Sequence, residues 1–383
     1  MKIIISDHKY PEKRNIITDG DNTYLNFRYK NLWLYINALK RKIFKKNKSF
    51  IFQTIPTLIP EDIAVIHLFN EVARTNRKWV STFETEIPRV LPVKGMAKLA
   101  NPELHSQLKL AAAAQCIGVI AISEATRNIQ LKLLHSFPAE KQVISAKLHV
   151  LHPPQSLLHE EVRHHCEPKV TFTFIGSDFY RKGGAEVVLA FSELADEGVI
   201  DVNTVQVNVI GDLTRRHNIA HGRFQDDEPF YTRIETLLGE LPVFKQVNSL
   251  PNTQFLQLLK ETQVGLLPTW QDTYGFSVLE MQASGCPVIT TNVRALPEIN
   301  PEQAGWLIAC PLNDRFELTV SSEQEKNQLR KLIVTKLKEQ VTAILQDRSM
   351  LHARSAGSLA RIRLEHDPAA FRARLNEIYQ SAI

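Results

Sequence analysis

The sequence predicts an α/β protein made of two doubly wound domains. Its 383 residues are too many for one ordinary domain and suit two domains of roughly 150–200 residues each. Segments typical of strands and helices alternate along both halves, which indicates mostly parallel sheets covered on both faces by helices. In the second half, two glycine-containing motifs directly follow strand-like runs. The carboxyl ends of parallel strands are where such sheets bind ligands.

The first domain is predicted to span residues 1–154, followed by a polar linker over residues 155–168. Short apolar runs define its strands, the last of them stopped by two prolines, and longer segments with helical periodicity define its helices. The expected strands are residues 2–6, 50–54, 63–68, 78–82, 118–123 and 148–154, and the expected helices are residues 32–44 and 101–114.

The second domain is predicted to span residues 169–355 and to show the same alternation. A helical segment over residues 356–383 ends the chain and can pack back toward the first domain. The expected strands are residues 170–175, 205–210, 243–247, 264–267, 287–291 and 306–308, and the expected helices are residues 185–194, 231–238, 253–261, 277–283, 323–345 and 368–379.

The bulk properties exclude several classes of protein. Apolar residues make up 44% of the chain, yet no run of them reaches the roughly 18–20 residues that cross a membrane. The apolar start of the chain is too short for a signal peptide, so we expect a cytoplasmic protein. Neither G-x-G-x-x-G after the first strand nor G-x-x-x-x-G-K-[ST] occurs, which weakens a dehydrogenase and removes a P-loop kinase. We expect no nucleic-acid partner.

The cysteines do not indicate a metal site or a disulfide framework. Cys116, Cys166, Cys286 and Cys310 are scattered, without C-x-x-C spacing, which favours buried or free thiols. His164 and His165 lie beside Cys166, in a polar segment rich in His, Glu and Pro. A solvated linker is therefore favoured there over a metal site.

The first motif is Gly176-Ser-Asp-Phe-Tyr-Arg-Lys-Gly-Gly184, between a strand-like run and a helix. Unpaired backbone N–H groups and the positive end of the helix dipole are expected to converge there, and Arg181 and Lys182 add full charges. This combination suits a phosphate group. The alternative is that Gly183 and Gly184 only allow a tight turn and close helix packing, beside a solvated pair of cations.

The second motif is Asp272-Thr-Tyr-Gly-Phe-Ser-Val-Leu-Glu280, which follows another buried strand. Its two carboxylates lie across a glycine-containing loop and the first turn of a helix, and they suit the hydroxyls of a sugar. The alternatives are that Asp272 is a turn residue and that Ser277 and Glu280 form a capping box. Together, the two motifs predict a pocket for the diphosphate and sugar rings of a nucleotide sugar.

The order and spacing of these motifs resemble a known family. The passage from Leu266 to Thr291, followed by Pro297-Glu298-Ile299, is similar to the donor-binding segment of the retaining GT-B glycosyltransferases of family 4. The resemblance is specific over residues 170–299 and loose across the N-terminal half. It implies the GT-B fold, in which two Rossmann-like domains have a donor/acceptor cleft between them, and hexose transfer without a tightly bound metal.

The resemblance also implies roles for single residues. Lys182 would bind the donor diphosphate, and Arg181 would add charge because Ser177 stands where the family often has Arg. Asp272, which is Glu in most members, would hold hydroxyls of the donor sugar, while Glu280 would accept hydrogen bonds from the ribose. The other donor-binding positions, which act through the backbone or shape the loops, are Gly176, Gly183, Gly275, Phe276 and Ser277.

On the acceptor side, the resemblance is weaker. Glu84 in Thr82-Phe-Glu-Thr85 replaces the histidine of a Thr-x-His motif that many members have after a strand. His67 is the nearest matching histidine and is the second candidate for an acceptor-side catalytic role. Its alternative is a satisfied, half-buried histidine.

A basic stretch lies in the first domain. No acidic residue occurs between Asp21 and Glu61, whereas lysines and arginines are interleaved there with aromatic residues. Such a stretch can lie on an anionic membrane surface. The alternative is a helix with a solvated lysine face.

These patterns predict an enzyme, a retaining hexosyltransferase. Its donor is expected to be a UDP- or GDP-sugar and its acceptor a glycan or a lipid-linked molecule, in lipopolysaccharide, capsule or exopolysaccharide assembly. We expect no cofactor and no tightly bound metal. A peripheral position on the inner face of the membrane is a second option for the location of this cytoplasmic protein. One alternative is a non-catalytic GT-B protein that binds a glycan or nucleotide, which is motivated by Ser177, Asp272 and Glu84. Another is a sugar-nucleotide epimerase of the same architecture.

Overall fold

The computed structural model describes residues 1–162 and 168–381, which form two compact units. The first unit holds Met1–Pro154 and His366–Ile383, and the second unit holds Gln155–Glu365. Part of the predicted linker is attached to the second unit, because the backbone N–H groups of Leu158 and His159 donate to the Ala283 carbonyl at 2.8 and 3.0 Å. The pair His164 and His165 and the thiol Cys166 lie outside the described residues.

The first unit is built on a parallel sheet of six strands in the order β2-β1-β4-β6-β7-β8. Its strands are β1 (Lys2–Ile5), β2 (Thr23–Asn26), β4 (Ile63–Phe69), β6 (Trp79–Phe83), β7 (Cys116–Ala121) and β8 (Leu148–Val150). The strand predicted over residues 50–54 is not in this sheet, since β3 (Ile51–Phe52) pairs with β5 (Val72–Ala73) in a separate small sheet. The edge position belongs to β2, whose half-exposed polar pattern gives little strand signal.

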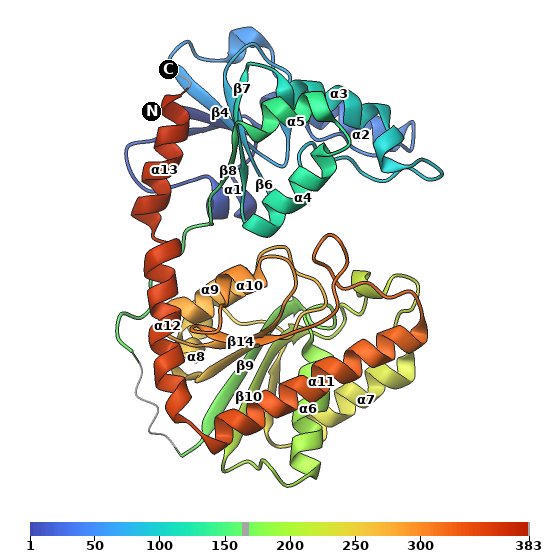
Figure 1. Ribbon diagram of the computed structural model, residues 1–383, viewed down its shortest axis with the longest axis vertical. Coiled ribbons are helices and arrows are strands. Elements are labelled where there is room, and N and C mark those ends of the chain that lie inside the picture. Colours follow the sequence, from blue (N-terminus) through green and yellow to red (C-terminus); the bar gives the residue numbers. More distant parts are fainter. Residues whose placement is uncertain (163–167, 382–383) are drawn as a thin grey trace. The chain divides into compact units, whose positions relative to one another are not determined.

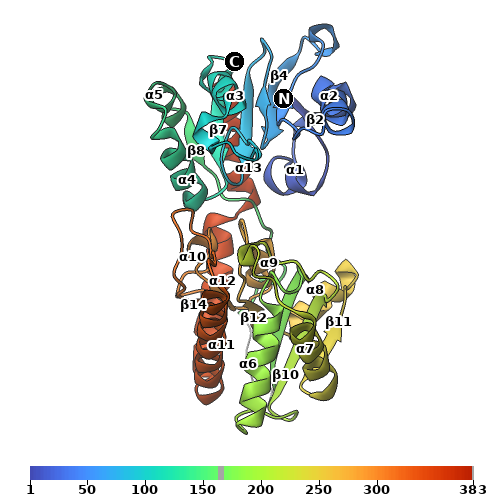
Figure 2. The same ribbon diagram turned by 90° about the vertical axis from the view of Figure 1, so that its right-hand side faces the viewer.

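The side chains of this sheet alternate between two apolar layers, as the pleat of a strand requires. Ile4 packs on one side in a cluster with Leu104 and Ile144, whereas Ile3 packs on the other side with Phe371 and Leu375. The unit's helices are α1 (Tyr10–Asn15), α2 (Leu32–Lys42), α3 (Pro102–Ala112), α4 (Glu124–Leu134), α5 (Pro138–Ser145) and α13 (Pro368–Gln380). The last helix of the chain thus supplies four of the ten buried residues of the second layer, Phe371, Leu375, Ile378 and Tyr379 (Figures 1 and 2).

The second unit has its own parallel sheet, in the order β11-β10-β9-β12-β13-β14. Its strands are β9 (Val170–Asp178), β10 (Val205–Asp212), β11 (Phe244–Val247), β12 (Val264–Leu267), β13 (Val288–Thr291) and β14 (Gly305–Ile308). Apolar β-branched and aromatic residues fill these strands because helices cover the sheet on both faces.

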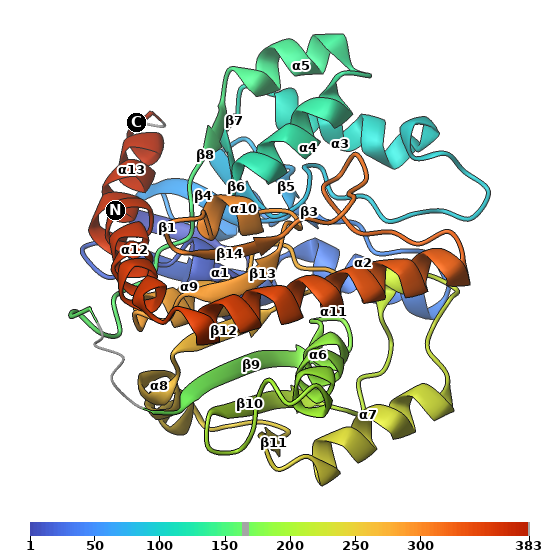
Figure 3. The same ribbon diagram turned by 60° about the horizontal axis from the view of Figure 1, so that its bottom comes forward.

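The helices of the second unit form two layers. One layer contains α6 (Gly184–Asp196), α7 (Glu228–Glu240) and the long α11 (Glu323–Gln346), which packs along α6 (Figure 3). The other contains α9 (Phe276–Ala283) and α12 (Ser349–Glu365), which pack on each other, with α8 (Asn252–Glu261) and the short α10 (Leu296–Ile299) in the connections between strands. The chain changes unit at His366 rather than at the expected residue 356, because α12 is continuous through that point.

Among the helices that the structure describes, none combines the length and the apolar character that a bilayer crossing needs.

Candidate donor-binding site

The two sequence motifs meet in the second unit because their strands are neighbours. β9 and β12 pair directly in the middle of the sheet, with Phe174 opposite Leu266. The first motif leaves the carboxyl end of β9 and the second leaves the carboxyl end of β12. Both loops therefore lie at the same edge of the sheet, where ligands of doubly wound folds bind.

Lys182 and Asp272 join the two motifs in an ion pair. Lys182 Nζ lies 2.5 Å from Asp272 Oδ2, and the two side chains are only 16% and 13% exposed. Burial raises the pKa of Asp272, but the Lys182 ammonium outweighs it and holds the pKa of Asp272 below its ordinary value. The other carboxylate oxygen accepts the backbone N–H of Thr273 at 2.8 Å. Asp272 is therefore a fixed, ionised group at the sheet edge.

Arg181 belongs to a second charged cluster beside this pair. Its Nε donates to Asp178 Oδ2 at 3.1 Å, and its Nη1 donates to the Gln271 carbonyl at 2.9 Å. The other oxygen of Asp178 accepts from Arg215 Nη1 at 3.0 Å. Burial raises the pKa of Asp178, but its hydrogen bonds with Arg181 and Arg215 hold that pKa below the ordinary value.

A cavity of about 580 Å³ opens beside this cluster, lined by Asp178, Arg181, Thr214, Arg215, His217 and Gln271 among others. Sequence reasoning missed Arg215, which lies in the loop after β10 and lacks a motif of its own. Only its position directly after a strand could have indicated Arg215, because the loops that follow two neighbouring parallel strands, here β9 and β10, lie side by side. The register pairs Asp212 with Asp178.

The glycines of the first motif serve close packing. A Cβ on Gly176 would lie 2.6 Å from Lys182 Cβ, so a side chain there would displace Lys182. Gly183 has a φ of +88°, and its Cβ would lie 2.1 Å from the Pro268 carbonyl oxygen. This is the packing alternative raised for Gly183, and it ties the first loop to the start of the second.

The expectation of unpaired N–H groups in the first motif is wrong for three residues. The N–H groups of Lys182, Gly183 and Gly184 donate to carbonyls of the same loop, those of Asp178, Tyr180 and Phe179, at 2.9, 3.3 and 2.9 Å. The loop folds into tight turns that use up these donors. The cationic side chains, rather than these backbone groups, are therefore what the first motif offers to a phosphate.

The helix N-terminus of the second motif is arranged differently. Gly275 is the N-cap of α9 and adopts a left-handed conformation, with a φ of +99°. Phe276 and Ser277 are the first two helical residues, and the geometry of a helix gives their N–H groups no intrahelical acceptor. Because the N-cap is Gly275, Ser277 does not hold the position that a capping box with Glu280 requires. That alternative is therefore excluded.

A buried ionic network supports the second motif from inside the unit. Arg330 of α11 pairs with Glu186 of α6 at 3.0 Å and with Asp226 at 2.7 Å. Its guanidinium carbon lies 6.0 Å from the ring of Trp270, whose backbone N–H donates to the Arg181 carbonyl at 3.0 Å. This network fixes both loops. No motif or spacing in the sequence predicts these ion pairs.

The two acceptor-side candidates lie in the first unit and have different surroundings. His67 is fully buried, with Nδ1 at 2.6 Å from the Tyr379 hydroxyl and Nε2 at 2.8 Å from Thr82 Oγ1, and burial lowers its pKa to about 3. Both ring nitrogens of His67 therefore have hydrogen-bond partners, as the structural alternative to a catalytic role expects, and no ring atom reaches the surface. Glu84 is partly exposed after β6, where it accepts hydrogen bonds from Asn70 at 3.2 Å and Arg89 at 3.3 Å.

Three cysteines fall within the described residues, and all three, Cys116, Cys286 and Cys310, are free and buried. Over residues 1–162 and 168–381, no three His, Cys, Asp or Glu side chains gather in a way that could hold a metal ion.

Comparison with known proteins decides the fold. Residues 159–340 match the family described as Glycosyl transferases group 1. The whole chain superposes on Anabaena Alr3699/HepE in complex with UDP and glucose, with a TM-score of 0.58 and 12% identity over 100% of both chains. The chain has the GT-B fold. The residues that match the family model lie in the second unit and contain both motifs.

Two further structures are similar to this GT-B chain. A UDP-forming α,α-trehalose-phosphate synthase from Burkholderia xenovorans has a TM-score of 0.60 and 12% identity over 100% of this chain and 99% of the other. A glycosyltransferase from Rickettsia africae has a TM-score of 0.56 and 15% identity over 94% of this chain and 84% of the other. A comparison with curated protein sequences gives no match. At these identities, the similar structures establish the fold alone.

Proposed function

We propose that this GT-B protein transfers a hexose, with retention of configuration, from a nucleotide diphosphate sugar to a glycan or lipid-linked acceptor. The observation that carries the proposal is the Lys182 and Asp272 pair, in which a cation and a carboxylate lie together at the edge of the sheet. Arg181 and Arg215 add charge at the adjoining cavity.

In the proposed reaction, negative charge develops on the diphosphate as it leaves the anomeric carbon. Preorganised cations and helix N-termini stabilise such charge in place, which is usually the largest catalytic contribution. Lys182 and Arg181 would face the phosphates, together with the first N–H groups of α9. A diphosphate oxygen would compete with Asp272 for Lys182, which leaves the Asp272 carboxylate able to accept a hydroxyl of the donor sugar.

UDP-sugars are the first donors to test. The similar Anabaena structure contains UDP and glucose, and the Burkholderia enzyme is UDP-forming. Glu280 lies on the first turns of α9, where it would accept hydrogen bonds from the ribose hydroxyls. GDP-sugars remain within the proposal, because the charged groups described above would contact the phosphates and the sugar rather than the base.

The experiment that tests the proposal is incubation of the protein with UDP-glucose and other UDP- and GDP-sugars, with and without glycan acceptors. Release of the nucleoside diphosphate, followed by NMR of the anomeric proton of the product, reports transfer and its stereochemistry. Nucleotide binding without release from any donor would favour the non-catalytic alternative. Conversion of the donor to its epimer would favour the epimerase.

We also propose that the first unit binds an anionic membrane surface through α2, in polysaccharide assembly at the inner face of the membrane. None of the residues of α2 is buried, although many are apolar. The exposed apolar stripe contains Tyr35, Ile36 and Leu39 of α2, which are 57%, 39% and 53% exposed, and continues past the helix end with Ile43 and Phe44, which are 61% and 59% exposed. Lysines and arginines flank this stripe, and no acidic residue occurs between Asp21 and Glu61.

A further inference from the structure

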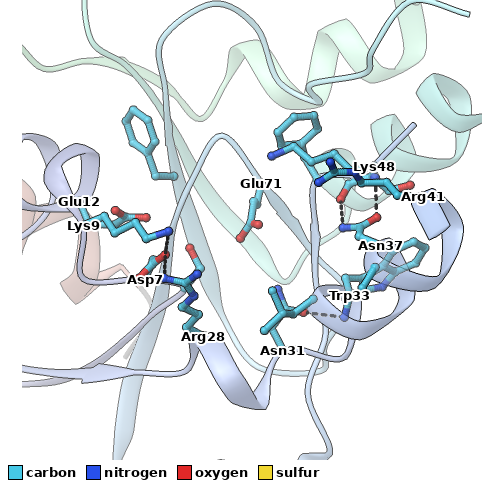
Figure 4. A pocket seen from close by; sticks show the side chains of 16 residues that line it. Asp7, Lys9, Glu12, Arg28, Asn31, Trp33, Asn37, Arg41, Lys48 and Glu71 are labelled. Carbon is cyan, nitrogen blue, oxygen red and sulfur yellow. Dashed lines mark hydrogen bonds and ion pairs between the residues drawn. The ribbon is translucent and has the colours of Figure 1, made fainter. Parts of the chain in front are cut away.

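A polar cavity of about 520 Å³ lies in the first unit, at the carboxyl end of β1 (Figure 4). Its volume falls within the roughly 300–1,000 Å³ of small-molecule sites. The walls come from α1, from the inner face of α2 and from the segments before β3 and after β4. The motifs of the second unit take no part in it.

One wall carries carboxyl groups in two different states. The negative charge of Asp7 is compensated by two cations, because Lys9 Nζ and Arg28 Nη1 both lie 3.2 Å from its Oδ2. Glu12 Oε2 and Glu71 Oε2 are buried and have no hydrogen-bond partner among the described residues. A buried oxygen without a partner costs free energy, which a donor such as a sugar hydroxyl would recover.

Another part of the wall carries two cations that are not held in an ion pair with any described residue. Arg41 and Lys48 form no ion pair within residues 1–162 and 168–381, although both line the cavity. Lys48 Nζ lies 4.4 Å from the centre of the Phe50 ring. Burial lowers the pKa of Lys48, with Arg89 and Arg41 reinforcing the shift and Glu71 opposing it. An anion between these two cations would be stabilised by both.

The cationic wall is held in place by the backbone. Asn37 on α2 donates to the Ser49 carbonyl at 2.8 Å, and its side-chain oxygen accepts the Ser49 N–H at 2.8 Å. This double hydrogen bond fixes the segment that carries Lys48 against the helix that carries Arg41. Figure 4 shows Asp7 and Glu12 on the other side of the space from Arg41 and Lys48, with Glu71 between the two groups.

Aromatic groups complete the cavity. Trp33, Phe50 and Phe69 line it, and Trp33 Nε1 donates to Gln53 Oε1 at 3.2 Å, which fixes the plane of the indole ring. Apolar ring faces beside a few fixed polar groups are typical of sites for small organic ligands. Among the described residues, the cavity here combines unpartnered carboxyl oxygens, aromatic rings and cations without an ion pair.

We propose that this cavity binds a sugar that carries an anionic group, with the anion between Arg41 and Lys48 and the hydroxyls at Glu12 and Glu71. The role of this sugar as the acceptor rests on the proposed function, whereas its binding does not. A phosphate ester and a uronic acid carboxylate share the required chemistry.

The test is isothermal titration of the full chain with glucose 6-phosphate, glucuronate and glucose. We expect at least one of the two anionic sugars to bind at least about tenfold more tightly than glucose. The double variant Arg41→Gln, Lys48→Gln should lose that preference, while Lys42→Gln, on the same helix but outside the cavity, should keep it. Which anionic sugar binds more tightly identifies the phosphate or the carboxylate as the source.

Equal binding of glucose and the anionic sugars, no binding of any of the three, or an anionic preference that survives in the double variant would each overturn the proposal. UDP titrated into the same samples separates it from the donor site. Normal UDP binding without binding of an anionic sugar defeats the cavity proposal only. Binding of an anionic sugar without UDP binding leaves the cavity proposal supported and defeats its acceptor role.

Discussion

Lys182 and Asp272 lie 90 residues apart in the sequence and form a nearly buried ion pair, with Nζ and Oδ2 separated by 2.5 Å. The pair joins the loop after β9 to the loop after β12, and both loops belong to adjacent strands. It also links the two chemical roles expected at this edge, phosphate binding and sugar binding. A substitution at either residue that removes its charge therefore leaves the other residue without its ion-pair partner.

We expect Lys182→Ala to reduce transfer by the equivalent of roughly 2–4 kcal/mol of transition-state stabilisation, as deletion of one preorganised donor does. The structure adds a stability cost of about 1–3 kcal/mol, because the nearly buried Asp272 carboxyl group would lose its cation. Steady-state kinetics and urea unfolding measure the two effects.

The double variant Lys182→Met, Asp272→Asn separates the effect on activity from the effect on stability. Removal of both charges should restore most of the stability but none of the activity. If Lys182→Ala kept normal kinetics with an active donor, the assignment of the donor site would fail.

The position of each motif could be predicted from the sequence, but the contact between them could not. Strand-like runs before Gly176 and Asp272 place both loops at carboxyl ends, which the structure confirms. Their adjacency depends on the strand order β9-β12, and periodicity along a chain does not determine that order. Arg215 was missed for the same reason, because its role depends on β10 lying next to β9.

The prediction of the fold from the sequence has the same limit. The alternation that predicts two parallel sheets is confirmed in both units, since buried strands carry continuous apolar runs. Strand β2 was not predicted, and helix α12 was expected only in its second half, within the helical segment over residues 356–383. β2 has a polar, half-exposed pattern, and α12 has small residues such as Ser355 and Ser358 at its buried positions, so its apolar periodicity is weak.

We expect Glu280→Gln to weaken UDP binding by about tenfold, because a charged acceptor of hydroxyl hydrogen bonds becomes a neutral one of the same shape. The capping-box alternative, which predicts no change, is excluded by the N-cap at Gly275. Isothermal titration with UDP gives the dissociation constants, and the exposed Glu240→Gln serves as the control. Equal affinities in all three proteins would remove Glu280 from the site.

The cluster around Asp178 predicts a graded response in nucleotide binding. Arg181 is 22% exposed and Arg215 is 56% exposed, so water and salt screen Arg215 more strongly. We expect Arg181→Gln to weaken UDP binding more than Arg215→Gln, which should lower affinity by about threefold or less and only at low salt. Arg233→Gln, on the exposed face of α7, is the control. The reverse order would show that the phosphates lie outside this cluster.

Glu71 predicts a pH dependence of stability. Burial raises the pKa of Glu71 to about 7, with Glu12 and Asp7 reinforcing the shift and with Ser6 and Lys48 opposing it. The folded state therefore binds a proton at Glu71 that the unfolded state has lost, between the ordinary pKa of a glutamate and about pH 7. The stability contributed by this proton is present at acidic pH and is lost as the pH rises through about 7.

We expect Glu71→Gln to raise the free energy of unfolding at pH 8 by about 1–2 kcal/mol, a value reduced for the solvent that reaches a partly exposed side chain. At pH 5, the variant and the wild type should differ little. Urea unfolding at both pH values measures the difference, and the exposed Glu61→Gln is the control. A variant that is equally stabilised at both pH values would show that Glu71 does not titrate in this range.

The membrane proposal predicts binding that depends on charge and on apolar contact together. Lysines near an anionic surface contribute about 1 kcal/mol each, within a Debye length of roughly 8–10 Å. Co-sedimentation with anionic liposomes should therefore fall steeply with added salt and weaken in the triple variant Lys42→Gln, Lys45→Gln, Lys46→Gln. The triple variant Lys109→Gln, Lys245→Gln, Lys331→Gln makes the same change in net charge elsewhere and should bind like the wild type.

The apolar stripe of α2 gives the sharper test, because a helix that only attracts lipid headgroups does not need it. Ile43 and Phe44 are 61% and 59% exposed, so serine in their place removes apolar area without opening the core of the first unit. We expect Ile43→Ser, Phe44→Ser to weaken liposome binding at constant charge and to leave UDP binding unchanged, since the proposed nucleotide site belongs to the second unit. Wild-type protein that fails to sediment with anionic liposomes at low salt would return α2 to a solvated helix.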